Sequence, residues 1–239
     1  ERAVPVMEQA LEQGQDVEAT LLAWIEELRD ANMVKYFTAA QYAADLIDDG
    51  DGVLTMCFAE TSFVMSLALA HRAGKNIRAY TPETRPYLQG ARLTAPCIYE
   101  LGIPVQIIGD NMPGYVLSQG KVQKYFTAAD LVTMDGHVVN KVGTFQNAVV
   151  ADYYHVPFFA FVGSPDPRKP DRASIEIEER DPGEMKACRG VPTTIPEIDA
   201  YYPAFDITPP HLVAGIITDR GVHSPYDLWR VFANDVKGD

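Results

Sequence analysis

The chain opens with a helical hydropathy pattern. In residues 1–47 apolar positions recur every three or four residues, and Asp16 suits the N-cap of a helix. The recurring positions include Leu21, Trp24, Ile25 and Leu28. A run rich in Asp and Gly, residues 48–52, ends the pattern. This run is most simply a solvated turn, because the ligand spacing of a calcium-binding loop is missing.

Beyond residue 52 short apolar runs alternate with amphipathic stretches. The predicted strands are residues 53–57, 77–80, 103–108, 130–132, 156–162 and 216–218. The predicted helices are residues 61–73, 93–101, 143–154 and 209–215. Such alternation predicts an α/β fold with a parallel sheet covered by helices on both faces. We therefore expect a helical N-terminal segment, residues 1–47, followed by a Rossmann-like domain, residues 48–239.

Composition excludes several classes of function. The chain has 33 acidic and 20 basic residues and a formal net charge of −13, which disfavours nucleic acid as a partner. No apolar run approaches the ~20 residues that span a bilayer, so no membrane partner is predicted. The chain has an odd number of cysteines, Cys57, Cys97 and Cys188, and none of them forms a CxxC motif. They indicate a reducing, cytoplasmic setting rather than a disulfide scaffold.

Polar residues that follow the predicted strands are the candidates for chemistry, because parallel sheets bind small molecules at the carboxyl ends of their strands. Cys57 closes the first strand, although a lone cysteine there is more often a small buried hydrophobe. The loop 83–92 contains Gln89 and could bind a sugar or phosphate, or could simply be salt-bridged. Asp130 has apolar neighbours that would raise its pKa and suit it to general acid catalysis, or it is an exposed strand end.

Asn140 and Lys141 precede Gly143 and Thr144 at the start of a predicted helix. This arrangement resembles an anion site at a helix N-terminus, with the lysine adding charge. The five histidines show no paired ligand spacing, and neither a Walker loop nor GxGxxG is present. The sequence therefore predicts no metal and no nucleotide cofactor.

Taken together, these segments resemble the S-methyl-5-thioribose-1-phosphate isomerase family. They keep the family's order, and the run ETRPYLQGARLT at residues 83–94 is highly specific to it. The other segments are GIPV at 102–105, DNM at 110–112, AD at 129–130, NKVGT at 140–144 and PAFDITP at 203–209. The wider family includes ribose-1,5-bisphosphate isomerases and regulatory subunits of a translation initiation factor that exchanges guanine nucleotide.

The resemblance implies a role for each candidate. The family's cysteine motif, T-x-C-N-A-G, is matched at residues 55–60 and puts the catalytic cysteine at Cys57, while the catalytic acid falls on Asp130. The substrate-binding positions fall on Gln89, Asn140 and Lys141.

Three substitutions depart from the family pattern. Phe58 and Glu60 replace Asn and Gly of the cysteine motif, and Leu131 replaces the arginine that usually follows the catalytic aspartate. These changes bear on the substrate more than on the reaction. The family also carries an arginine-containing loop and another phosphate-binding arginine in an N-terminal domain, and neither has a counterpart before Cys57.

The resemblance thus implies an aldose–ketose isomerase that acts on a small sugar phosphate, 5-methylthioribose 1-phosphate, in methionine salvage, as a homodimer. One alternative is an isomerase of 5-deoxyribose 1-phosphate or ribose 1,5-bisphosphate. The other is a non-catalytic regulatory protein that senses a sugar phosphate. The segment 110–112 favours the methylthioribose branch, and the presence of both Cys57 and Asp130 argues against a regulatory protein.

Overall fold

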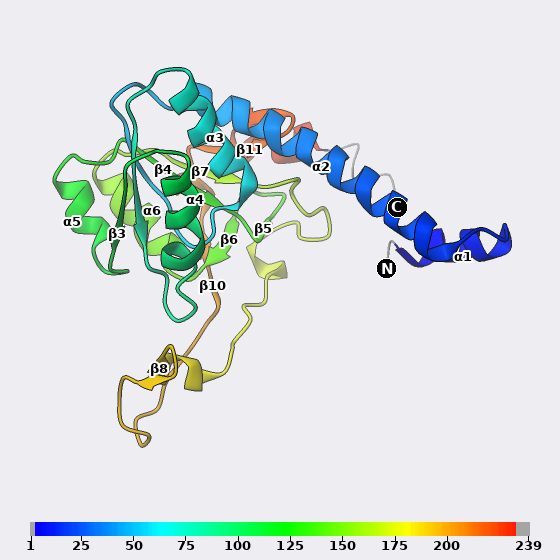
Figure 1. Cartoon of the computed structure of the whole chain (residues 1–239). Helices are drawn as coiled ribbons and strands as arrows, with labels where there is room; N and C mark the ends of the chain where they lie inside the picture. Colours follow the sequence, from blue (N-terminus) through cyan, green and yellow to red (C-terminus); the bar gives the residue numbers. More distant parts are fainter. Residues whose placement is uncertain (1–2, 233–239) are drawn as a thin grey trace.

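The computed structural model describes residues 3–232 and contains a seven-stranded, mostly parallel sheet (Figure 1). The strand order is β12-β11-β7-β4-β1-β2-β3, and only the pairing of β12 with β11 is antiparallel. The strands are β1 (Gly52–Leu54), β2 (Arg78–Pro82), β3 (Val105–Ile108), β4 (Lys124–Ala128), β7 (Phe158–Phe161), β11 (Gly215–Thr218) and β12 (Gly221–His223). The predicted sheet with helices on both faces is confirmed.

Helices cover the two faces of this sheet in separate groups. One face carries α2 (Val17–Leu46), α3 (Glu60–Arg72) and α4 (Ala95–Glu100), and the other carries α5 (Pro113–Ser118) and α6 (Thr144–Tyr153). A short α7 (Leu228–Val231) ends the described chain, and a π-helical turn (Gly90–Thr94) leads into α4. Four 3-10 turns complete the helical elements: Arg172–Ser174, Pro182–Lys186, Pro210–Leu212 and Pro225–Asp227.

Neighbouring residues of each strand enter two different cores. Val53 packs with α2 and α3, whereas Leu54 packs with α5 and α6. Phe126 and Tyr125 divide in the same way on β4. Because successive side chains of a strand point to opposite faces, a strand with two buried faces must be apolar throughout. This is why the strands appear in the sequence as continuous apolar runs.

The N-terminal segment is helical, as predicted, and projects from the domain. α1 (Ala3–Glu12) packs beside the first turns of α2, and Asp16 caps α2 by accepting a 3.1 Å hydrogen bond from the amide of Ala19. Figure 1 shows this half of α2 extending away from the sheet. The apolar positions there stay outside the core, with Leu22 and Ile25 exposed, and burial begins only at Ala39. None of the helices in residues 3–232 combines the length and apolar character needed to cross a bilayer.

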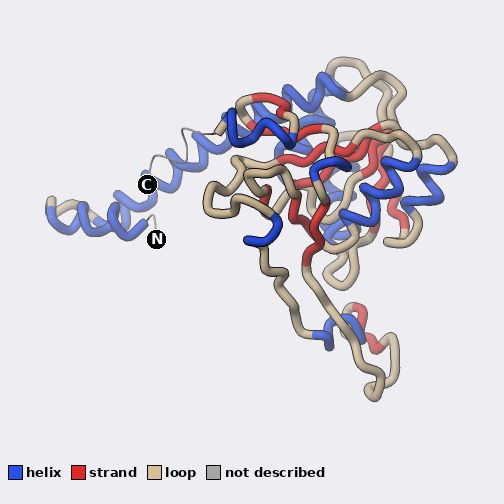
Figure 2. The backbone as a smooth tube through the Cα atoms, turned by 180° about the vertical axis from the view of Figure 1, so that it is seen from behind, coloured by secondary structure: helices blue, strands red, loops and turns tan. Residues whose placement is uncertain are grey.

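A second, antiparallel sheet of order β10-β6-β5 stands beside the first. Its strands are β5 (Leu131–Val132), β6 (Val138–Lys141) and β10 (Phe205–Thr208). Between β7 and β10 the chain leaves the domain as a long arm tipped by a hairpin of β8 (Ala187–Cys188) and β9 (Val191–Pro192), visible in Figures 1 and 2. The arm returns to the body immediately before β10.

The sequence misassigned several of these elements. The predicted helix over residues 209–215 is wrong: this segment holds only a 3-10 turn between β10 and β11. The predicted strand at residues 130–132 exists as β5 but belongs to the small sheet. The central strand β4 and strands β6 and β10 were not predicted; each interrupts its apolar residues with polar ones, such as Lys124, Asn140 and Asp206.

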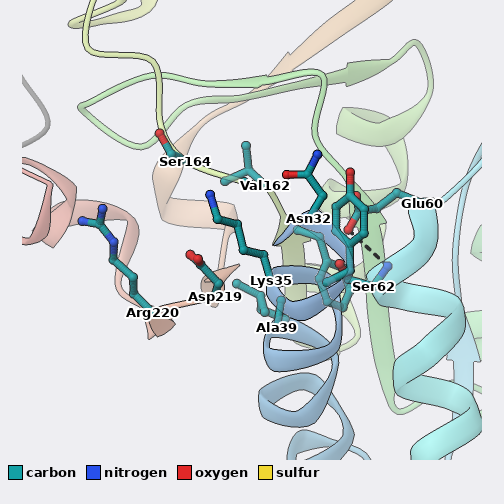
Figure 3. Close-up of a pocket in the computed structure, with 13 residues that line it drawn as sticks. Asn32, Lys35, Ala39, Glu60, Ser62, Val162, Ser164, Asp219 and Arg220 are labelled. Atoms are coloured by element: carbon teal, nitrogen blue, oxygen red, sulfur yellow. Dashed lines mark hydrogen bonds between the residues drawn. The ribbon is translucent and has the colours of Figure 1, made fainter. Parts of the chain in front are cut away.

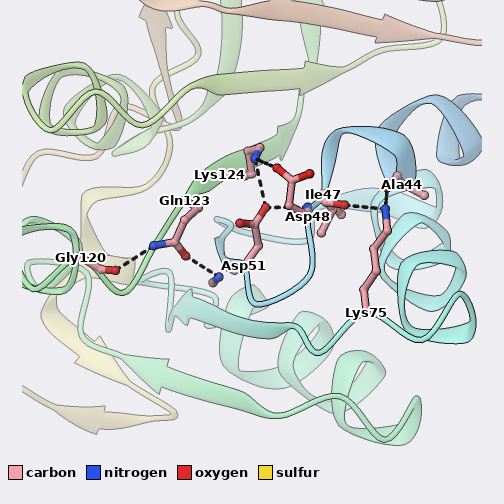
Figure 4. A network of polar contacts seen from close by, with 9 residues as sticks. Ala44, Ile47, Asp48, Asp51, Lys75, Gly120, Gln123 and Lys124 are labelled. Carbon is pink, nitrogen blue, oxygen red and sulfur yellow. Dashed lines mark hydrogen bonds and ion pairs between the residues drawn. The ribbon is translucent and has the colours of Figure 1, made fainter.

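The acidic turn after α2 is more than a solvated loop. Figure 4 shows the Lys124 ammonium between Asp48 and Asp51, at 3.0 and 3.1 Å, and Asp51 is buried. The ammonium of Lys75 donates to the carbonyls of Ala44 and Ile47, at 2.9 and 2.6 Å, and so satisfies the C-terminus of α2. These contacts fix the junction between α2 and β1.

We predict that Gly90→Ala destabilises the domain by about 1–3 kcal/mol, because a Cβ atom at residue 90 would lie 1.9 Å from the carbonyl oxygen of Pro82 at the end of β2. Urea unfolding measures the effect. The matched control is Gly163→Ala, since a Cβ at residue 163 meets nothing within 4 Å. Equal stability of both variants would contradict the close approach.

Candidate active site

The direction of the strand connections reverses between β1 and β4. From β1 the chain moves outward through α3 to β2 and β3, and then crosses back to β4 before continuing to β7. Open parallel sheets bind ligands in the crevice at such a switch point, beyond the carboxyl ends of the strands. Cys57 follows β1 and Asp130 follows β4. The two predicted catalytic residues therefore stand on either side of the switch point.

The backbone of Cys57 is held in an unusual conformation by two threonines. Its φ of 61° lies in the left-handed region, which costs a non-glycine residue of the order of 1 kcal/mol. The amide of Cys57 donates to the hydroxyl of Thr84 at 3.1 Å, and the hydroxyl of Thr94 donates to the Cys57 carbonyl at 2.5 Å. Both threonines belong to the segment 83–94, so this motif positions the cysteine.

Asp110 in turn fixes that segment. Its carboxylate accepts hydrogen bonds from the amides of Thr84 and Arg85, both at 2.7 Å. Asp110 does not cap the next helix, since the N-cap residue of α5 is Met112, which makes no side-chain hydrogen bond. The turns after β1, β2 and β3 are therefore linked in one hydrogen-bonded chain.

Asp130 is an exposed residue at the end of β4, which was the second alternative expected, yet partial burial of its carboxyl group by the surrounding protein raises its pKa. The positive charges of Lys141 and Arg180 oppose this shift without cancelling it. The direction agrees with the prediction made from the apolar neighbours of Asp130. A carboxyl group whose pKa is raised can retain its proton and donate it, as a general acid must.

Cys57 and Lys141 share the same electrostatic environment. Burial raises the pKa of the Cys57 thiol, and Lys141 opposes the shift. Burial also lowers the pKa of Lys141, whose side chain is only 3% exposed and donates to the Tyr202 hydroxyl at 3.2 Å. Lys141 and Asp130 both influence the pKa of Cys57, Lys141 influences the pKa of Asp130, and Cys57 and Asp130 both influence the pKa of Lys141. The structure therefore brings these three predicted residues together.

The other two predicted residues are placed differently. Asn140 is buried on β6 next to Lys141 and donates to the Thr144 hydroxyl at 3.0 Å, at the start of α6. Gln89 immediately precedes the π-helical turn, and its side-chain oxygen is buried with no hydrogen-bond partner among residues 3–232. A buried amide oxygen without a partner is a candidate for binding a ligand hydroxyl.

The N-terminus of α6 does not form the anion site suggested by the sequence. The Asp206 carboxylate already accepts hydrogen bonds from the amides of Gly143 and Phe145, at 2.6 and 3.1 Å. Burial raises the pKa of Asp206 to about 6, and these amides oppose the shift. A protein carboxylate thus caps the helix, and Lys141 remains as the cation for an external anion.

Sequence reasoning missed one charged residue of this site. Arg180 lies in the charged segment 176–181, outside every motif identified in the sequence, but its charge acts on Cys57, Asp130 and Lys141. Its side chain is 26% exposed and is paired with Glu178 at 2.7 Å. The segment has no hydrophobic periodicity, so no pattern in the sequence indicated that it returns to the site.

A separate cavity of about 380 Å³ lies between α2, the start of α3 and the carboxyl ends of β7 and β11 (Figure 3). Lys35, Glu60 and Asp219 line it, and Ser62 donates its amide to Glu60 at 3.3 Å. None of Cys57, Asp130 and Lys141 lines this cavity. Within residues 3–232 no three histidine, cysteine, aspartate or glutamate side chains gather so that they could hold a metal ion.

Comparison with protein families places these residues in context. The model of the Initiation factor 2 subunit family matches residues 3–225. Methylthioribose-1-phosphate isomerase of Pelotomaculum thermopropionicum is 41% identical over an alignment of 198 residues, which covers 79% of this chain and 54% of that protein. The protein of the same name from Desulfitobacterium hafniense is 43% identical over an alignment of 162 residues, which covers 66% of this chain and 47% of its own length. The chain spans about half the length of these curated relatives.

Two solved structures match almost the whole chain. Translation initiation factor eIF-2B subunit delta from A. fulgidus has a TM-score of 0.85 and 33% identity, covering 98% of this chain and 71% of its own. The 5-methylthioribose 1-phosphate isomerase from Pyrococcus horikoshii has a TM-score of 0.85 and 31% identity, covering 96% and 68%. Backbone similarity alone therefore does not separate the enzyme from the initiation factor.

The buried cap at Asp206 leads to a prediction about stability and pH. Because its folded pKa is raised, the carboxyl group favours the folded state at low pH, and this contribution is lost as pH rises from about 4 through about 6. Asp206→Asn keeps an oxygen acceptor but never ionises. Between pH 4 and pH 7 wild type should therefore lose up to about 3 kcal/mol of unfolding free energy that Asp206→Asn does not lose.

Urea unfolding at several pH values provides the measurement, with Asp45→Asn on the exposed side of α2 as the control. A constant difference between wild type and Asp206→Asn at all pH values would refute the raised pKa.

Proposed function

The chain belongs to the Initiation factor 2 subunit family, and we propose that it is an aldose–ketose isomerase that converts 5-methylthioribose 1-phosphate to 5-methylthioribulose 1-phosphate in methionine salvage. The observation that carries the proposal is the meeting of Asp130, with a raised pKa, and Cys57 at the switch point of the sheet, beside the buried cation of Lys141. Curated relatives named for this reaction, at about 40% identity, support it.

The chemistry requires a proton donor. An aldose 1-phosphate is a closed ring whose anomeric oxygen carries phosphate, so it cannot open like a free sugar. A proton must reach the ring oxygen while the C–O bond breaks, and we assign this donation to Asp130. Lys141 would hold the phosphate, and Gln89 and Asn140 would hold hydroxyl groups.

Hydrogen then moves from C2 to C1 by one of two routes. In the first, Cys57 acts as a base and an enol-type intermediate forms. In the second, hydride passes directly, and Cys57 stabilises charge. Burial keeps the pKa of Cys57 above its ordinary value, so the protein starts from a thiol, and the first route needs an initial deprotonation. Neither route requires a metal or a nucleotide.

Two alternatives remain distinct from this proposal. The first is a different substrate, 5-deoxyribose 1-phosphate or ribose 1,5-bisphosphate, because Phe58 and Glu60 alter the cysteine motif. The second is a non-catalytic role, because the initiation factor subunit and the isomerase match this chain with the same TM-score. A turnover assay on this panel of pentose phosphates decides among them, because a regulatory protein converts none.

We also infer a reducing, cytoplasmic setting, since Cys57, Cys97 and Cys188 are all unpaired thiols. We further propose that the protein is a homodimer and binds neither nucleic acid nor a membrane.

Asp130→Asn should lower kcat by roughly 100- to 10,000-fold with little change in substrate affinity, because the amide keeps the shape of the side chain but cannot act as an acid. In wild type, activity should fall as pH rises through the raised pKa of Asp130, since only the protonated form donates. Steady-state kinetics across pH and direct binding measure both effects. Near-normal turnover of the variant would remove Asp130 from the mechanism.

Cys57→Ser should fold normally and lose most of its turnover, because a serine hydroxyl neither ionises nor stabilises charge as sulfur does. The matched controls are Cys97→Ser and Cys188→Ser, whose residues lie outside the site. Circular dichroism reports folding, and the isomerase assay reports activity. Equal losses at all three positions would indicate a packing effect instead.

A further inference from the structure

Two cations share the same pair of aromatic rings at the edge of the site. The Lys141 ammonium lies 5.7 Å from the ring centre of Tyr87 and 5.3 Å from that of Phe205. The guanidinium carbon of Arg180 lies 5.6 and 5.4 Å from the same two centres. Both rings therefore border a single region that the two cations flank, although Lys141 and Arg180 are distant in sequence.

Backbone pairing fixes Arg180 at this place. Its amide donates to the carbonyl of Tyr202 at 3.0 Å, and the amide of Ala204 donates to the carbonyl of Glu178 at 2.8 Å. The next residue, Phe205, is paired directly with Lys141 across β10 and β6. The returning chain, residues 202–205, thus holds the outgoing segment 178–180 beside the small sheet, near Lys141.

The Glu178 carboxylate orients the guanidinium. Nε of Arg180 donates to it at 2.7 Å and one terminal nitrogen donates at 3.3 Å. The guanidinium also interacts with the hydroxyls of Tyr87 and Tyr202, but it carries five N–H donors, more than these contacts use. Glu178 is half exposed, and together with Asp130 and Phe205 it lines a cavity of about 230 Å³. The guanidinium is therefore held next to an opening that reaches the proposed general acid.

Lys141 lacks such a partner. Among residues 3–232 its ammonium makes one hydrogen bond, to the neutral hydroxyl of Tyr202, although the side chain is buried. A buried ammonium without a bonded carboxylate is costly, and a second cation close by adds to the cost. Proteins accept such unfavourable arrangements mainly at functional sites, where a ligand supplies the missing charge. The ligand that would supply the missing charge beside Lys141, and that Arg180 could also bind, is an anion.

We propose that Arg180 is a second anion-binding residue, which together with Lys141 holds the phosphate group of the substrate. The inference rests on the proposed function for the identity of the substrate, but not for the presence of an anion site. A guanidinium can form two parallel hydrogen bonds to phosphate oxygens, whereas the ammonium acts as a point charge. The pair combines orientation from Arg180 with charge from the buried Lys141.

The test compares Arg180→Gln and Arg180→Lys with wild type, using inorganic phosphate as the probe in titration calorimetry and the isomerase assay in parallel. The control is Arg29→Gln, which removes one positive charge beside Asp30 on the projecting part of α2. Thermal unfolding of each variant reports whether the arm still packs.

Arg180→Gln should weaken phosphate binding roughly tenfold or more and raise KM by a similar factor with little change in kcat, because the interaction exists in both ground and transition states. Arg180→Lys should restore part of the affinity, and Arg29→Gln should match wild type. A purely structural role predicts a lower Tm without selective loss of phosphate binding.

Unchanged phosphate affinity in Arg180→Gln, or no measurable phosphate binding by the unmodified chain, would overturn the inference. Phosphate binding that depends on Arg180 in a protein that converts no pentose phosphate would instead refute the proposed function and leave the anion site standing.

Discussion

The site depends on one strained turn at the end of β1. Cys57 adopts a left-handed conformation, and two threonine hydroxyls hold its amide and carbonyl. Asp110 then holds the loop that carries the first threonine. The conformation of a single residue is therefore secured by turns that follow three adjacent strands. Such strain persists only where the surrounding structure determines it, and here the parallel sheet brings those turns side by side.

The site gathers positive charge, whereas the molecule as a whole is strongly negative. The chain carries a formal net charge of −13, yet Lys141 and Arg180 come together while burial favours the neutral forms of Cys57 and Asp130. Two cations thus come together within an acidic protein. A negative surface limits non-specific binding of polyanions, while a small anion can still enter the pocket. Lys141 is buried, so bulk salt screens its charge far less than it screens the surface acids.

The sequence predicted the parts of the fold that arise from local pattern. Apolar runs such as residues 53–57 identified strands because two buried faces demand continuous apolar residues, and Asp16 identified the start of α2. Cys57 could be named because it closes a predicted strand, Asp130 because of its apolar neighbours, and Lys141 because it precedes a predicted helix start. The family resemblance pointed to all three. Arg180 could not, because its position depends on backbone pairing with residue 202, across the whole arm. The role of Asp206 was missed for the same reason, since its amide partners lie in another segment.

The pairing of β6 with β10 also bears on how the molecule folds. Gly143 and Asp206, which meet at the start of α6, are 63 residues apart, and the intervening chain includes β7 and the entire arm. The βα units of the large sheet involve much shorter loops, and closure of a long loop costs more entropy and slows folding. The scaffold can therefore form before the anion-binding edge does. During synthesis, a nascent chain that has not yet reached residue 205 holds β1, β4 and β7 but lacks the strand against which Lys141 is fixed.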